Sequence, residues 1–155
     1  MSSVQLLFST SPHPVSRLLR YATWSSWSHV ALVNGDQVIE AVTSVGVRQV
    51  SLSSAICNAS TYALVELPAK NSQKVHQVAR SQIGKRYDWS AIVGLGLQRD
   101  WQEDDAWFCS ELIAWAAATA GERWFRCEAL HRVTPQHLWM LAPVAQQCSH
   151  VESIG

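Results

Sequence analysis

The spacing of the apolar residues changes halfway along this chain of 155 residues, and this change constrains the fold most. Before residue 70 the apolar residues form short runs bounded by proline, glycine, asparagine or serine, as strands do. Beyond residue 70 they recur every three or four positions, as on one face of a helix. This predicts an α+β fold, with an antiparallel sheet from the N-terminal half packed against helices from the C-terminal half.

Strands are predicted from five short apolar runs: residues 4–9, 29–33, 37–42, 45–52 and 61–67. The pair Asn34-Gly35 separates the second run from the third, and Asn-Gly between apolar runs is the strongest short hairpin signal. The sheet is therefore expected to follow meander order along the chain.

Helices are predicted where the apolar spacing lengthens: residues 14–22, 71–83, 89–97, 108–120 and 136–141. Gly84 and Gly121 follow two of these segments and are typical helix-ending residues. Thr134-Pro135 is a capping residue followed by proline at the first helical position. Residues 99–106 are polar and are predicted to form a loop, and the tail 143–155 is expected to be loosely held.

Length and charge limit the classes of protein that this chain can belong to. Residues 1–155 make one domain, with twelve basic and twelve acidic residues and a net charge of zero. A nucleic-acid-binding protein would carry a strong basic excess, so that class is excluded. No apolar run approaches the ~18 residues of a membrane span. No secretory signal is recognised, so a cytoplasmic location is the default expectation, with export by another route left open.

Cys109 is the first candidate for chemistry, because it lies at the predicted start of the 108–120 helix. The free N–H groups and the dipole of a helix N-terminus favour the thiolate, which is the nucleophilic form of cysteine. The alternative is that Cys109 is a small buried apolar residue. No Cys-x-x-Cys pair is present, and the four cysteines are interpreted as thiols.

His29 and Glu40 are the next candidates, because the predicted hairpin brings them together. A two-residue turn at Asn34-Gly35 places His29 directly opposite Glu40 on the neighbouring strand, with both side chains on one face. A carboxylate in that position can orient the imidazole and stabilise its protonated form. The alternatives are a histidine in an ordinary structural role and a solvated glutamate. A nucleophile, a base and an orienting acid are thus available in the order His, Glu, Cys.

Four short motifs resemble the permuted branch of the NlpC/P60 papain-like superfamily, which includes the YiiX-like bacterial proteins and the lecithin:retinol acyltransferase group. The motifs are Ser28-His-Val-Ala-Leu32, Val38-Ile-Glu-Ala41, Gly84-Lys-Arg-Tyr-Asp88 and Trp107-Phe-Cys-Ser-Glu-Leu-Ile113. In ordinary members the cysteine helix precedes the histidine strand, whereas here the order is reversed, as in the permuted members. The resemblance spans about residues 4–141.

The resemblance implies a papain-like cysteine hydrolase with Cys109 as nucleophile, His29 as base and Glu40 as third member. The implied substrate is a small molecule, peptide or lipid with an amide or ester bond, cleaved through a thioester. No cofactor is expected. Tyr87 and Ser110 fall in the family motifs, as residues that contact substrate or simply pack.

Four of the eight tryptophans crowd the two segments that precede the predicted base and the predicted nucleophile. They are Trp24, Trp27, Trp101 and Trp107. If the two segments meet at one cleft, Trp27 and Trp107 are candidates to contact substrate. The alternative is that these side chains belong to the core.

Three other functions stay open at this point. Acyl transfer uses the same triad with an alcohol or amine in place of water. A non-catalytic binding module could retain the same fold. A zinc site could use Cys127, His131, His137 and Cys148, although their spacing matches no ordinary zinc finger, and no metal is expected.

Overall fold

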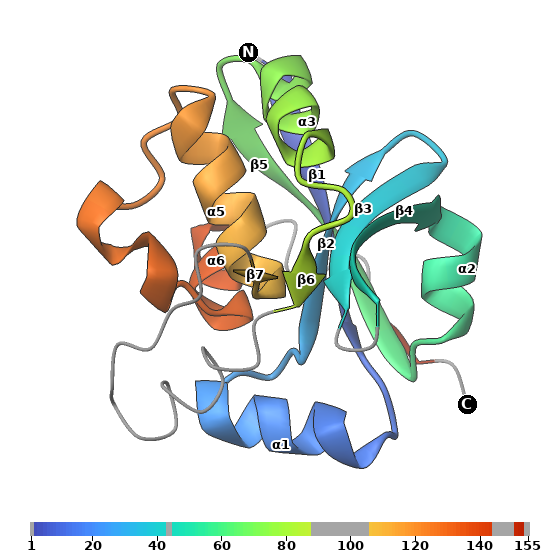
Figure 1. Ribbon diagram of the computed structural model, residues 1–155. Coiled ribbons are helices and arrows are strands. Elements are labelled where there is room, and N and C mark those ends of the chain that lie inside the picture. Colours follow the sequence, from blue (N-terminus) through green and yellow to red (C-terminus); the bar gives the residue numbers. More distant parts are fainter. Residues whose placement is uncertain (1, 43–44, 88–105, 144–150, 154–155) are drawn as a thin grey trace.

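Figure 1 shows the computed structural model, which describes residues 2–42, 45–87, 106–143 and 151–153. The strands are β1 Ser2–Thr10, β2 His29–Asn34, β3 Gln37–Val42, β4 Gly46–Ser51, β5 Thr61–Ala69, β6 Arg86–Tyr87, β7 Ala106–Trp107 and β8 Val151–Ser153. The helices are α1 Pro14–Thr23, α2 Leu52–Cys57, α3 Ser72–Arg80, α5 Cys109–Thr119, α6 Pro135–Leu141 and the 3-10 helix η1 Cys127–Arg132. The α+β class predicted from the sequence is confirmed. The predicted 89–97 helix and most of the 99–106 loop lie outside the described residues.

The main sheet has six strands in the order β4-β3-β2-β1-β5-β8, and every neighbouring pair is antiparallel. The meander prediction is correct for β1 to β4 but wrong for β5, which pairs with β1. Leu6, Leu7 and Phe8 in β1 are all buried. Such a continuous apolar run is typical of a strand covered on both faces, and β1 is accordingly central.

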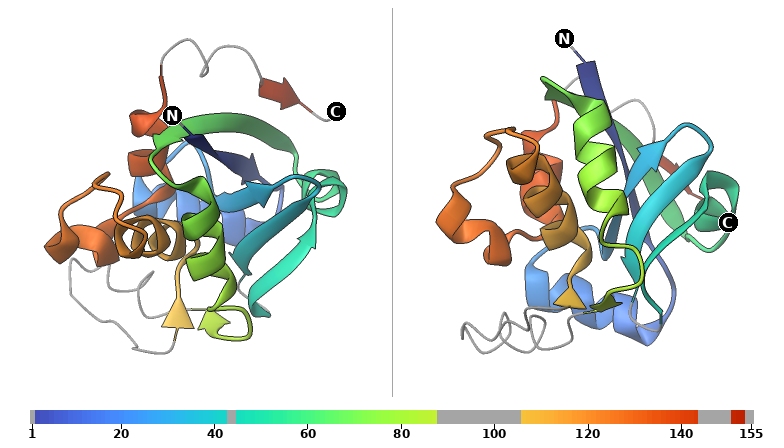
Figure 2. Two further views of the ribbon diagram at one scale, coloured as in Figure 1. Left: turned by 90° about the horizontal axis from the view of Figure 1, so that it is seen from above. Right: turned by 45° about the horizontal axis from the view of Figure 1, so that its top comes forward.

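The two faces of the sheet are covered by different helices, as Figure 2 shows. Phe8 and Leu32 point to one face and join the main core with α3 and α5. Leu7 and Val33 point to the other face and pack against α2. Helix α2 was not predicted, because six residues capped by Ser51 are too few to show a helical period.

The turn between β2 and β3 is displaced by one residue from the prediction. The pairs are Leu32 with Ile39, Val33 with Val38 and Asn34 with Gln37, so Gly35 and Asp36 form the loop. Only the first loop residue has a positive φ, of 63° at Gly35, as in a type II′ turn, whereas a type I′ turn at Asn34-Gly35 would need two. The displacement moves the partner of each residue by two, so the side chains keep their faces.

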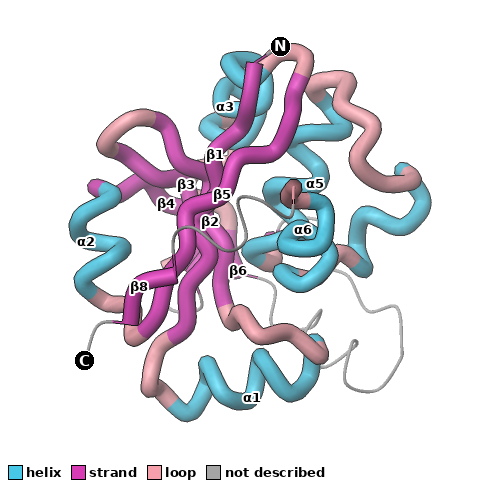
Figure 3. The backbone as a smooth tube through the Cα atoms, turned by 180° about the vertical axis from the view of Figure 1, so that it is seen from behind, coloured by secondary structure: helices cyan, strands magenta, loops and turns pink. Residues whose placement is uncertain are grey.

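Part of the C-terminal tail is a strand. Val151–Ser153 form β8, which continues the sheet along the free edge of β5, as Figure 3 shows. The prediction of a loosely held tail is therefore wrong for these three residues. Among the described residues no helix is long and apolar enough to span a membrane.

Candidate active site

The first turn of α5 positions Cys109. Phe108 is the N-cap in extended conformation, and Cys109 is the first helical residue, with 1% of its surface exposed. No side chain caps this helix start. The first-turn N–H groups have no partner within the helix, so they produce a positive field around the Cys109 side chain. Phe108 is buried against the ring of Tyr87, with centroids 6.0 Å apart, and this contact fixes the helix start.

The imidazole of His29, the first residue of β2, connects the other two members of the predicted triad. Its Nε2 lies 2.7 Å from Oε2 of Glu40, and its ring hydrogen-bonds the side chain of Cys109. Because Nε2 is engaged by the carboxylate, Nδ1 is the ring nitrogen left to interact with the thiol. The structure thus brings Cys109, His29 and Glu40 together, although the predicted pairing of His29 directly opposite Glu40 differs from the observed register.

Arg48 is a fourth member of this cluster that the sequence analysis did not identify. Its Nε and Nη2 donate to Oε1 of Glu40 at 3.0 and 2.9 Å, while Oε2 is left for His29. Arg48 lies directly opposite Glu40 across β3 and β4. The available signal was an arginine in the run that follows the glutamate strand, since opposite charges pair across neighbouring strands.

The charges of the cluster stabilise one another. Burial lowers the pKa of His29, but its hydrogen bonds to Cys109 and Glu40, and the negative charges of both groups, outweigh burial and raise it to about 10. Burial raises the pKa of Glu40, but the hydrogen bonds and charges of His29 and Arg48 outweigh burial and lower it to about 2. At neutral pH the protonated form of His29 is therefore favoured, beside the ionised carboxylate of Glu40.

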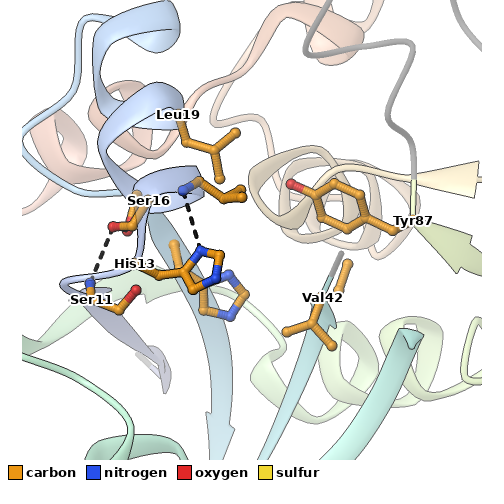
Figure 4. A pocket seen from close by; sticks show the side chains of 10 residues that line it. Ser11, His13, Ser16, Leu19, Val42 and Tyr87 are labelled. Carbon is orange, nitrogen blue, oxygen red and sulfur yellow. Dashed lines mark hydrogen bonds between the residues drawn. The ribbon is translucent and has the colours of Figure 1, made fainter. Parts of the chain in front are cut away.

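Two cavities border His29. The larger, of about 400 Å³, is lined by α1, by the segment before it and by parts of β2, β3 and β6. Figure 4 shows residues of α1 on one side and Val42 and Tyr87 on the other. His13 also lines it, with Nδ1 accepting the Val15 N–H. The smaller cavity, of about 210 Å³, is lined by Glu40 and Arg48 among others.

The residues predicted to contact substrate are placed differently from one another. Tyr87 lines the larger cavity. Trp27 is instead buried in the core against the rings of Phe8 and Trp139, and it lines neither cavity beside His29. Ser110 is fully buried, and its Oγ donates to the backbone oxygen of Val133, so this hydroxyl holds the segment before α6.

Of the other tryptophans, Trp24 is almost fully exposed. The side chain of Trp107 and the whole of Trp101 lie outside the described residues. The predicted aromatic wall is therefore wrong for Trp27, because its ring fills the space between β1 and α6.

The residues considered as an alternative zinc site do not form a cluster in the described part of the chain. Nδ1 of His137 accepts a hydrogen bond from the backbone N–H of Thr134 and takes part in the cap of α6. Cys127 is exposed, and Cys148 lies outside the described residues. Among the residues described, no three His, Cys, Asp or Glu side chains are placed to hold a metal ion.

Comparison with known proteins identifies a family and similar solved structures. A family model described as permuted papain-like amidase enzyme, YaeF/YiiX, C92 family, matches residues 4–151. The crystal structure of metalloprotein YiiX from Escherichia coli O157:H7 is similar, with a TM-score of 0.60 and 18% sequence identity over 99% of this chain and 96% of that one. At this identity the likeness to YiiX supports the fold. No curated protein sequence matches this chain.

Proposed function

This chain belongs to the permuted papain-like amidases of the YaeF/YiiX, C92 family, and we propose that it hydrolyses an amide bond with Cys109, His29 and Glu40 as its catalytic triad. The observation that carries this assignment is the position of His29, whose ring hydrogen-bonds the thiol and the carboxylate at once. A nucleophile in contact with a base that is itself oriented by a third group is the general signature of covalent catalysis.

In the first half of the reaction, the thiolate of Cys109 attacks the carbonyl carbon of the substrate. The N–H groups at the start of α5 are the donors available to the developing oxyanion, because no side chain caps them. The imidazolium of His29 then donates its Nδ1 proton to the departing amine, and a thioester remains on Cys109.

In the second half, His29 is neutral and accepts a proton from a water molecule that attacks the thioester. The carboxylic acid leaves, and the proton on His29 restores the ion pair with Cys109. Glu40 stays ionised throughout and holds the ring through Nε2, as the acid of a triad does. The larger cavity beside His29 has room for a substrate side chain next to this reacting centre.

Hydrolysis is proposed over acyl transfer because the matching family is one of amidases. An alcohol or amine that displaced water would give acyl transfer through the same thioester. YiiX is described as a metalloprotein. The described residues of this chain do not fit a metal ion, so the proposed steps use none.

Intact-mass spectrometry with acyl p-nitroanilides of varied acyl group tests this proposal. Wild-type protein should gain the mass of one acyl group as p-nitroaniline is released, and then lose that mass as water releases the carboxylic acid, over successive turnovers. Cys109→Ala should form no adduct and release no p-nitroaniline above the uncatalysed rate. Cys57→Ala is the matched control, because Cys57 is an exposed thiol outside the site. Retention of wild-type activity by Cys109→Ala would contradict the proposal.

A further inference from the structure

Helix α1 has two faces with different roles. Its inner face contains Ser16, Leu19 and Thr23, which are buried, and it helps to line the larger cavity. Its opposite side, here called the outer face of α1, consists of Arg17, Leu18, Tyr21 and Trp24. Leu18, Tyr21 and Trp24 are 58, 84 and 91% exposed. In the described part of the chain none of these side chains has a hydrogen bond, an ion pair or a ring contact.

The backbone conformation of Trp24 and the exposure of its side chain indicate that tryptophan at this position does not stabilise the fold. Trp24 caps the end of α1 in the left-handed conformation, with φ of 51°. Glycine is the usual residue there, because a side chain at positive φ costs free energy. Here the largest side chain occupies the position while only 9% of its surface is covered by the rest of the protein (91% exposed). Together with Leu18 and Tyr21 on the same face, this tryptophan makes an exposed apolar patch, and such patches mark sites of interaction with a partner.

The charge near this face narrows the chemistry of the partner. Helix α1 contains Arg17 and Arg20, and the first acidic residue of the chain is Asp36. The net charge of the whole chain is zero, so this segment concentrates positive charge that the chain balances elsewhere. The partner of the outer face is therefore expected to be anionic as well as able to accept apolar side chains.

We propose that the outer face of α1 binds the headgroup region of a lipid bilayer that contains anionic phospholipid. Tyrosine and tryptophan prefer this region, where one part of the ring is apolar and the other is wet. Arginine next to them is attracted to anionic headgroups. Helices that lie in the plane of a membrane surface insert apolar side chains and are attracted to anionic lipid by basic ones, and the outer face of α1 offers both kinds.

The size of the face favours a bilayer over a second protein. A helix of ten residues is about 15 Å long and about 10 Å wide. That area is several times smaller than the ~800 Å² that each partner contributes to a stable protein interface. Binding to a bilayer needs only a few inserted side chains and nearby positive charge. Because the inner face lines the larger cavity, a bound α1 would hold that cavity beside the membrane.

Co-sedimentation of the full chain with vesicles tests this proposal. One set of vesicles is pure phosphatidylcholine, and the other contains phosphatidylglycerol as about a third of the lipid. We expect the apparent affinity for the anionic vesicles to be at least tenfold higher, and to fall when salt is added, since salt screens charge. We expect the apparent affinity for anionic vesicles to fall at least tenfold in Tyr21→Ser/Trp24→Ser and several-fold in Arg17→Gln.

Matched variants separate this face from general stickiness. Ile83→Ser/Met140→Ser removes two other exposed apolar side chains, and Lys74→Gln removes an exposed cation of α3. Both should bind anionic vesicles as wild type does, and circular dichroism should show that every variant is folded. Failure of wild type to sediment with anionic vesicles would overturn the proposal. So would an equal loss of binding in the matched variants.

Discussion

Glu40 divides its two carboxylate oxygens between two cations. Oε2 holds His29, and Oε1 accepts both hydrogen bonds from Arg48. The sequence predicted the first contact, because a hairpin with a short turn brings residues 29 and 40 to the same face. It did not predict the second, because the pairing of β3 with β4 depends on a connection that has no comparably strong turn signal.

Removing the positive charge of Arg48 should narrow the pH range of activity. Arg48 helps to keep the pKa of Glu40 near 2, so its loss raises that pKa, and Glu40 is protonated at higher pH. In Arg48→Met the acidic limb of kcat/KM should therefore move to higher pH, with a rate about tenfold lower at neutral pH. Arg48→Lys should recover part of both effects, because it keeps the charge but not the paired geometry.

The pH–rate profile separates this positioning role from a purely structural one. Lys74→Met, which removes an exposed cation from α3, should leave the profile unchanged. If Arg48→Met lowered the melting temperature but left the acidic limb in place, Arg48 would be a structural residue only.

Trp24 offers a second test at the scale of one residue. Trp24→Gly should stabilise the fold by about 1 kcal/mol, because glycine adopts positive φ without the steric cost that other residues meet. For a domain of this size that corresponds to a rise of roughly 2–4 °C in melting temperature. Trp24→Ala keeps the strain and should melt below Trp24→Gly. Equal melting temperatures for the two variants would contradict the strained conformation.

At the scale of elements, the predictions succeeded where a local signal fixed the structure. Gly121 located the end of α5, proline at the first turn located α6, and the Asn-Gly pair located the hairpin. The predicted 71–83 helix ends earlier than Gly84, at Arg80, with Ser81 as its C-cap. The position of β5 beside β1 could not be predicted. After β4, the chain can pair its next strand with the free edge of β4 or with that of β1, and no local signal in the connection through α2 decides between the two edges. The one-residue error at the turn depended on the sign of φ at Asn34, which is not positive as the predicted turn requires and which the sequence does not reveal.

The junction of β4 with the segment before β6 should be the element contact most sensitive to substitution. Gly46 has φ of 88°, and a Cβ there would clash with the backbone oxygen of Lys85. That oxygen also accepts the N–H of Val47. Gly46→Ala should therefore destabilise the fold by at least 2 kcal/mol in urea unfolding, since backbone must move.

Gly35→Ala is the matched control for this junction. Gly35 also has positive φ, but nothing lies within 4 Å of an added Cβ. Gly35→Ala should lower the free energy of unfolding by only about 1 kcal/mol, because only the positive φ is unfavourable for alanine there. Similar costs for Gly35→Ala and Gly46→Ala would show that the contact with Lys85 is not a tight constraint.

At the scale of the whole molecule, the permuted order of the motifs is compatible with a papain-like site. The helix that carries the cysteine packs on the strands that carry the other two residues, whichever of them comes first in the chain. The strands that provide His29 and Glu40 come first, and α5 returns across the same sheet to place Cys109 beside them (Figure 1). The sequence predicted these three residues and the fold class. It did not predict the cavity, because His13 and Val42 meet only when α1 packs at the end of the sheet.

The central claim is that Cys109 and His29 form a thiolate–imidazolium pair, and cysteine alkylation measures this directly. Iodoacetamide labelling is followed by mass spectrometry at each cysteine from pH 5 to pH 9, in wild type and His29→Ala. Exposure alone predicts that Cys109, at 1%, reacts more slowly than the exposed Cys57 and Cys127.

The pair predicts the opposite order. In wild type Cys109 should be alkylated fastest and should stay reactive well below the ordinary thiol pKa of about 8.5. In His29→Ala this advantage should disappear. If Cys109 in wild type reacts no faster than Cys57 and Cys127 at pH 6, the thiolate–imidazolium pair does not exist and the proposed mechanism is wrong.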